Sequence, residues 1–170
     1  VAVKAVSSEM LHKTERSAVR LDIASAEALE KTVSELQEAF ADARSELEGF
    51  LVEGMIGGAA EFIVGLQDDP CFGPVLMLGT GGILIHLLDD VTFRVLPASR
   101  SDIEGMIEEV RGKMLLRGFR GKPPLNEAAL VETLLSIGRF GVDASGLYTS
   151  VDFNPVVLSE AEAAAVDAKI

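Results

Sequence analysis

Apolar residues recur along the chain at two spacings, one typical of β-strands and the other of α-helices. Runs that alternate with polar residues, or are continuously apolar, predict strands at 1–6, 17–24, 49–55, 59–66, 73–79 and 83–97. Apolar residues three and four positions apart predict helices that begin near Ser25, Ser101 and Glu127, the first with an apolar stripe from Leu29 to Leu47. This order of elements predicts an α+β fold in which helices cover one face of a mainly antiparallel sheet.

The final segment, 151–170, predicts a hairpin with one apolar and one polar face. Val151, Phe153 and Val157 alternate with Asp152 and Asn154. Successive side chains of a strand point to opposite faces of the sheet, so the first three residues should share one face and the two polar residues the other.

The turn of this hairpin decides which polar residues meet. If it is centred between Glu160 and Ala161, residues whose numbers sum to 321 lie opposite each other, so that Asn154 faces Asp167 (154 + 167 = 321). Directly opposed Cβ atoms are about 5 Å apart, which allows an amide and a carboxylate oxygen to share a hard cation such as Mg²⁺. A solvated hairpin face would show the same spacing, so the pattern alone leaves both interpretations open.

Four charged residues in predicted strands are candidate cofactor-binding positions. Lys4 and Arg94 each lie in an apolar run, where burial of an unpaired cation is costly, so each needs an anion. For Lys4 that anion could be a phosphate or a neighbouring glutamate. Glu53 and Glu61 are available either to pair with Lys4 or to bind a ribose hydroxyl.

Two polar stretches between strands could also carry chemistry. His12 lies beside Lys13 and Arg16, and a loop histidine can accept a phosphoryl group or carry a proton, although most are simply exposed. The glycine-rich stretch 79–83 could present backbone N–H groups to an anion or form a tight turn. It matches neither the P-loop nor the dinucleotide-binding pattern, and the chain has no CxxC or HExxH motif.

Composition narrows the classes of partner and compartment. The chain has 170 residues, 48% of them hydrophobic, which is enough for one sizeable core. Its net charge of -12 disfavours nucleic acid and anionic membranes as partners. A single cysteine, Cys71, suits a reducing compartment, and no apolar run is long enough to span a bilayer. We therefore expect a cytoplasmic location and no membrane partner.

Several motifs, taken in order, carry a family resemblance. The runs VAVKAVSSEMLHK, LVEGM, GAAEFIVGLQDDPCFGPVLMLGTGG, FRVLP, GFRGKPP and VDFNP followed by VDAKI resemble the ATP-grasp portion of NDP-forming acyl-CoA synthetases. That family includes ADP-forming acetate–CoA ligases and is related to the succinyl-CoA synthetase β subunit. The resemblance implies a single ATP-grasp domain over 1–170 that lacks the first part of the fold and is a fragment of a larger multidomain protein.

The resemblance also implies how the chain would bind its cofactors, ATP or ADP and Mg²⁺. Lys4 would contact the nucleotide phosphates. Glu53 and Met55 would belong to the hinge segment against which adenine stacks. Asn154 and Asp167 match the two magnesium-holding positions of the family, which agrees with the hairpin pairing.

Two further residues would act in phosphoryl transfer. His12 matches the family's loop histidine, which would carry phosphate between a remote acyl-CoA site and the nucleotide, and Asp152 matches an acid that helps to hold the phosphohistidine. The reaction implied is acyl-CoA + ADP + phosphate ⇌ acid + CoA + ATP. CoA-binding and ligase domains, fused or in a separate subunit, would be the partners, and the full-length protein would be an oligomer.

A second hypothesis is a regulatory nucleotide-sensing domain that transfers no phosphate. The family loop after the histidine usually reads HKSDVGGV, whereas this chain has HKTERSAV, and loss of both glycines should stiffen a loop that must swing. His86 also stands where relatives usually have an acid. Phosphorylation of His12 would distinguish the two hypotheses.

Overall fold

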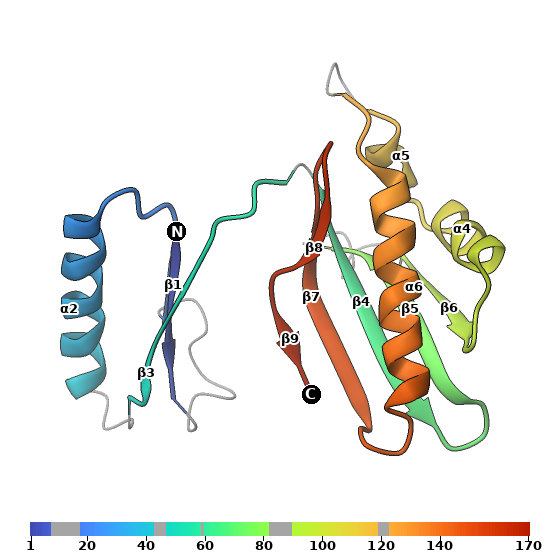
Figure 1. The fold of residues 1–170 in the computed structure, drawn as a ribbon, viewed down its shortest axis with the longest axis horizontal. Coiled ribbons are helices and arrows are strands. Elements are labelled where there is room, and N and C mark those ends of the chain that lie inside the picture. The colour runs from blue at the N-terminus through green and yellow to red at the C-terminus, as the bar shows by residue number, and fades with distance from the viewer. Residues whose placement is uncertain (8–17, 43–46, 59, 82–89, 119–122) are drawn as a thin grey trace. The chain divides into compact units, whose positions relative to one another are not determined.

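The computed structural model describes residues 1–7, 18–42, 47–58, 60–81, 90–118 and 123–170. Within these residues the chain forms two compact units, Val1–Met55 and Ile56–Ile170. In each unit, at least one helix packs against an antiparallel sheet (Figure 1). The predicted α+β class is confirmed, with two sheets in place of one, while the prediction of a single domain over 1–170 stays a prediction.

The Val1–Met55 unit is a three-stranded sheet with one helix. Its strands are β1 (Ala2–Val6), β2 (Val19–Arg20) and β3 (Gly49–Glu53), in the order β2-β1-β3, and the helix is α2 (Ala26–Asp42). Ser25 caps α2 as predicted, because its Oγ accepts a hydrogen bond from the Ala28 N–H at 3.2 Å. Val3, Leu36 and Phe40 form the buried core between helix and sheet.

The apolar stripe predicted for this first helix extends beyond the observed helix. α2 ends at Asp42 in the described residues, and Leu47 lies in the segment that leads into β3. Leu47 still packs against the same core. Leu47 is itself outside a helix, and its contact with this core explains its place in the apolar pattern.

The Ile56–Ile170 unit has a larger sheet. Its strands are β4 (Ala60–Asp69), β5 (Gly73–Thr80), β6 (Val91–Val95), β7 (Ser150–Leu158), β8 (Ala163–Ala165) and β9 (Ala168–Lys169). The sheet order is β6-β5-β4-β7-β8, and β9 also pairs with β7. The helices of this unit are α4 (Arg100–Glu109), α5 (Lys113–Leu116) and α6 (Glu127–Asp143). Phe62, Leu78, Met106 and Leu134 are among the fully buried core residues.

Local capping explains where the helices of this unit begin. Ser99 accepts a hydrogen bond from the Asp102 N–H, and the Asp102 side chain accepts one from the Ser99 N–H, so α4 starts at Arg100, slightly before the predicted Ser101. Asn126 caps α6 by accepting from the Ala129 N–H at 3.0 Å. Within α6, a Cβ at Gly141 would lie 2.8 Å from Leu66 Cδ2, so glycine permits close packing of α6 on β4.

Strand pairing separates the two faces of the larger sheet. Val151 pairs with Leu66, and Leu66 with Leu76; all three side chains are buried on the face covered by α4 and α6 (Figure 1). The next row, Asp152 with Gly65 and Gly65 with Met77, therefore lies on the opposite face. We call this second surface the uncovered face, because no described helix of the unit packs on it.

Candidate functional site

The C-terminal hairpin has the predicted register. Asp152 pairs with Lys169 and Val156 with Ala165, each pair summing to 321 (152 + 169 and 156 + 165). Between them, the Asn154 N–H donates to the Asp167 carbonyl oxygen at 3.2 Å. The predicted opposition of Asn154 and Asp167 is confirmed, since their backbones meet directly.

The predicted face of Val157 is wrong. The register of β7 against β4 shifts between Phe62 and Val64, so that Phe62 pairs with Val156 and Val64 with Phe153. This irregularity brings Val156 onto the face covered by helices and places Val157 opposite Glu61. Strict alternation along the sequence could not show the extra residue, because it depends on the pairing with β4.

Four polar side chains gather on this hairpin. Partial burial raises the pKa of Asp152, whereas the positive charge of Lys169 and a side-chain hydrogen bond from Asn154 act to lower it. The negative charge of Asp167 acts in the same direction as burial and raises the pKa of Asp152. Asp152, Asn154, Asp167 and Lys169 thus form one electrostatically coupled group, which we call the hairpin cluster. Lys169 was not predicted as a site residue, although the register rule places it opposite Asp152.

The donor set of the hairpin cluster suits a magnesium ion. Asn154 and Asp167 offer an amide and a carboxylate oxygen, which are hard donors, and Mg²⁺ takes only one or two protein ligands beside water and phosphate oxygens. The described residues contain no group of three or more His, Cys, Asp or Glu that could hold a metal.

The uncovered face extends the cluster with apolar and acidic groups. Phe93 pairs with Met77, Met77 with Gly65, and Gly65 with Asp152, so this row of β6, β5, β4 and β7 shares one face. Glu61 lies on the same side of β4 because it is four residues from Gly65, and its side chain is exposed. This face therefore carries the apolar side chains of Met77 and Phe93 beside acids and an amide.

In the Val1–Met55 unit, Lys4 has the anionic partner that its burial requires. Lys4 Nζ lies 3.1 Å from Glu53 Oε2, and the two side chains are 25% and 37% exposed. Val3 and Ala5 pack toward α2, so Lys4 projects from the other face of this sheet, as does Leu51 with which it pairs. Met55, at the end of the unit, is 44% exposed. The neighbouring-glutamate interpretation of Lys4 is thereby confirmed, and a role toward phosphate stays a prediction.

Arg94 also has its expected anion, on the covered face of the sheet. Its Nη2 lies 2.7 Å from Glu109 Oε1, and its Nη1 donates to Glu109 Oε2 at 3.0 Å, which links β6 to α4. Hydrogen bonds from Arg94 and Thr92 lower the pKa of Glu109 to about 2. Arg94 pairs with Leu76, a residue of the helix-covered row, and so lies on the side of the sheet opposite Asp152. The predicted role of Arg94 in cofactor binding stays a prediction.

Asp90 is the most buried acid among the described residues, and no sequence pattern indicated its role. Thr80 Oγ1 donates to Asp90 Oδ2, the Arg111 N–H donates to Oδ1 at 2.8 Å, and the Gly112 N–H donates to Oδ2 at 3.0 Å. Burial acts to raise the pKa of Asp90, but these hydrogen bonds outweigh it and lower the pKa below its ordinary value. Asp90 thus joins the end of β5, the start of β6 and the segment before α5.

The glycine-rich stretch and the loop histidine are only partly within the described structure. Gly79 and Thr80 belong to β5, and the Gly81 N–H donates to the Glu61 carbonyl oxygen at 2.8 Å, so this N–H already has a partner. Gly82 and Ile83 lie outside the described residues. His12 and His86 lie outside the described residues as well, so the predicted phosphoryl carrier stays a prediction.

No helix in the described part of the chain is long and apolar enough to cross a membrane.

Similarity to a known protein family identifies the class to which this chain belongs. An ATP-grasp domain family matches residues 1–170, and the chain belongs to that family. It is 37% identical to the β subunit of ADP-forming acetate–CoA ligase II of Pyrococcus furiosus, over 100% of this chain and 74% of that subunit. It is 35% identical to ADP-forming acetate–CoA ligase I of Archaeoglobus fulgidus, over 98% of this chain and 24% of the relative. The predicted fold and family are confirmed.

Solved structures show the same relationship. Dinucleotide-forming acetyl-coenzyme A synthetase 1 of Candidatus Korarchaeum cryptofilum, in complex with coenzyme A, Ca-AMPCP and HgCl+, matches with a TM-score of 0.89 and 37% identity, covering 98% of this chain and 73% of that chain. Another structure of that protein, with a TM-score of 0.84, 36% identity and coverage of 99% and 74%, holds coenzyme A and Mg-AMPPCP, with a phosphohistidine segment pointing towards the nucleotide binding site. The predicted cofactors, an adenine nucleotide and magnesium, agree with this neighbour.

Proposed function

We propose that this chain is the nucleotide- and magnesium-binding portion of an ADP-forming acyl-CoA synthetase. The observation that carries the proposal is the hairpin cluster, in which Asn154 and Asp167 are opposed within a register fixed by backbone hydrogen bonds. Its support is the nucleotide and metal held by the Korarchaeum neighbour. The whole reaction, acyl-CoA + ADP + phosphate ⇌ acid + CoA + ATP, would also require CoA-binding and ligase portions.

Asn154 and Asp167 would hold the metal, which when bound neutralises the negative charge of the nucleotide phosphates. Lys4 would contact the phosphates and share its charge between them and Glu53. Glu53, Met55 and Glu61 are the proposed contacts to the base and ribose. Lys4 projects from the side of its sheet opposite α2, and Asp152 from the uncovered face of its own sheet.

The chemical step would transfer a phosphoryl group between His12 and ADP. The P–N bond of phosphohistidine breaks as a terminal β-phosphate oxygen of ADP takes the phosphoryl group, and the released imidazole nitrogen takes up one proton. Asp152 would orient the imidazole by accepting a hydrogen bond from its other N–H. Such transfer depends on positioning and charge stabilisation, which matches a site built on strands.

Thermal melting of the complete protein tests the binding part of the proposal. ADP at a hundred times its dissociation constant should stabilise the fold by about 2.7 kcal/mol when Mg²⁺ is present. The Asn154→Ala/Asp167→Ala double variant should lose the magnesium-dependent part of this shift. Glu160→Ala is the matched control, because it removes one negative charge from the exposed turn of the same hairpin. An unchanged shift in the double variant would contradict the assignment.

Labelling with ATP that carries a radioactive γ-phosphate tests the transfer step. An acid-labile phosphohistidine that His12→Ala abolishes is the expected result for a ligase. The altered loop sequence HKTERSAV favours the second hypothesis, a nucleotide-sensing domain. That hypothesis predicts the melting shift without any phosphohistidine.

A further inference from the structure

One end of the Ile56–Ile170 unit exposes large apolar side chains. Phe72, in the turn from β4 to β5, is 68% exposed, and Leu147, in the loop from α6 to β7, is 85% exposed. Phe140 and Val142, near the end of α6, are 43% and 39% exposed. We call these four residues the tip surface; the two turns lie at the same end of the unit (Figure 1).

Two adjacent aspartates fix the turns that carry Phe72 and Leu147. Asp69 Oδ1 accepts hydrogen bonds from the N–H groups of Cys71 at 2.8 Å and Phe72 at 2.9 Å. Asp68 Oδ2 accepts from the Gly146 N–H at 2.7 Å, directly before Leu147. Apolar side chains on turns that are already ordered lose less entropy when they bind a partner, which makes them suitable anchors.

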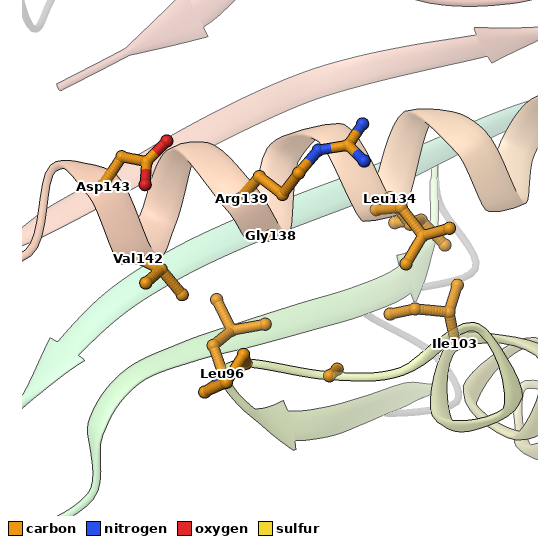
Figure 2. A pocket seen from close by; sticks show the side chains of 10 residues that line it. Leu96, Ile103, Leu134, Gly138, Arg139, Val142 and Asp143 are labelled. Carbon is orange, nitrogen blue, oxygen red and sulfur yellow. The ribbon is translucent and has the colours of Figure 1, made fainter.

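The end of α6 adds a stacked ring pair and a groove. The rings of Phe140 and Tyr148 stack with centroids 6.4 Å apart and an interplanar angle of 15°. Val142 also lines a cavity of about 280 Å³ between α6 and the segment after β6, together with Leu96 and Leu134 (Figure 2). Projecting apolar residues next to a concave apolar surface are typical of a protein interface.

We propose that the tip surface is the docking site for the CoA-binding portion of the ligase; this inference rests on the proposed function. The matched region makes up 24% of the Archaeoglobus relative and 74% of the Pyrococcus β subunit. The ATP-grasp portion thus occurs both fused to a longer chain and as part of a separate subunit. A separate subunit can stay with its partner only through a non-covalent surface.

The charges around the tip surface define the chemistry of that partner. Asp68 and Asp69 accept hydrogen bonds from backbone N–H groups and the Ser145 hydroxyl, which are neutral donors that bring no positive charge to these turns. Arg139 and Asp143, one base and one acid, both line the groove, so Asp68 and Asp69 leave this end of the unit with an excess of negative charge. The docking partner should therefore present an apolar patch with a rim of lysine or arginine.

Cys71 allows a direct test in the complete, assembled ligase. It is exposed, lies next to Phe72 and is the chain's one cysteine. Its alkylation by N-ethylmaleimide can be followed by mass spectrometry of the peptide that contains it. If the tip surface is docked, alkylation should be at least about tenfold slower than in a Phe72→Ser/Leu147→Ser variant, which loses the anchors. Met114→Ser removes a 62% exposed side chain from α5 and should leave the protection intact.

Three outcomes decide the inference. Protection that the double variant loses, while the nucleotide-dependent melting shift remains, supports docking and shows that the variant is folded. Equal alkylation in the unmodified protein and the double variant overturns it. Protection that increases with protein concentration, together with a doubled mass in light scattering, assigns the surface to a second copy of the chain and also overturns it. Absence of the melting shift from the unmodified protein would contradict the proposed function and leave the alkylation result valid.

Discussion

Asn154 and Asp167 are joined through their backbones, the N–H of the first donating to the carbonyl oxygen of the second at 3.2 Å. This bond lies within a hairpin whose pairs on either side, Asp152 with Lys169 and Val156 with Ala165, keep the same register. A slip of one residue would move the side chains to opposite faces. Strand pairing, which specifies the register, is therefore what brings an amide and a carboxylate together at the proposed metal site.

The electrostatics of the hairpin cluster predict opposite effects of two substitutions on the pKa of Asp152. Lys169→Met should raise the pKa of Asp152, because the variant loses a positive charge that favours the ionised carboxylate. Asp167→Asn should lower the pKa of Asp152, because the variant loses a negative charge that disfavours the ionised carboxylate. Carboxyl-carbon NMR titration of the protein without metal measures both. Lys31→Met, on α2, is the control and should leave the titration unchanged; equal effects of the three variants would contradict the coupling.

The raised pKa of Asp152 also predicts a pH-dependent gain in stability from Asp152→Asn. A folded-state pKa above the unfolded value means that the ionised carboxylate opposes folding; this cost grows as the pH rises above the unfolded pKa and is complete above the folded pKa. The variant without metal should therefore be more stable than the unmodified protein at neutral pH, and the difference should vanish as the pH falls below the unfolded pKa. Urea denaturation at several pH values checks this. A difference that grows on acidification would show the sign to be wrong.

Lys4 should contribute to nucleotide binding from its half-buried position beside Glu53. A hydrogen bond to a charged group is worth about 1.5–3 kcal/mol, so Lys4→Met should weaken ADP binding by about tenfold or more. Isothermal titration calorimetry measures this, with Lys31→Met as control because Lys31 is an exposed lysine of the same unit. Equal affinities for the two variants would mean that Lys4 serves only as the partner of Glu53.

Asp90 should be a structural residue. Its carboxylate accepts three hydrogen bonds in a site where the residue is 7% exposed, so Asp90→Ala leaves buried donors unsatisfied and should destabilise the fold by about 3 kcal/mol. Chemical denaturation provides the measurement. Asp143→Ala, at an exposed position, should change stability by less than about 0.5 kcal/mol. Comparable losses in the two variants would contradict the role given to Asp90.

The Arg94–Glu109 pair predicts an acid-dependent part of stability. The pKa of Glu109 is lowered from 4.5 to about 2 in the folded protein, so its stabilising effect is present above the unfolded value and disappears as the pH falls toward 2. Glu109→Gln should therefore be destabilised at neutral pH and should converge with the unmodified protein in acid. Glu104→Gln on the same helix is the control. A pH-independent difference would point to lost packing instead.

The local pattern of apolar and polar residues was enough to predict the pairing of the hairpin and the start of one helix. The register of the hairpin follows from alternation and the position of one turn, and the start of α2 follows from the cap at Ser25. The hairpin register and the helix cap each depend on residues within one short segment of the sequence. For this reason the amino-acid sequence alone predicts the opposition of Asn154 and Asp167.

Features that depend on distant pairing could not be predicted in this way. The face of Val157 is set by a register shift against β4, and the anion that neutralises Arg94 comes from a helix that follows β6. The role of Asp90 depends on donors at the end of β5 and before α5. A cation such as Arg94 in an apolar run signals that a partner exists, but only the fold shows which one.

Binding of Mn²⁺ and ADP, followed by the electron paramagnetic resonance signal of free Mn²⁺, tests the central claim most directly. Mn²⁺ can replace Mg²⁺ at a site of oxygen ligands, and its bound and free forms differ in signal. Asn154→Ala and Asp167→Ala should each weaken metal binding in the presence of ADP by at least about tenfold, whereas Glu160→Ala should not. Equal metal affinity in all three variants would contradict the assignment of the hairpin as the metal site.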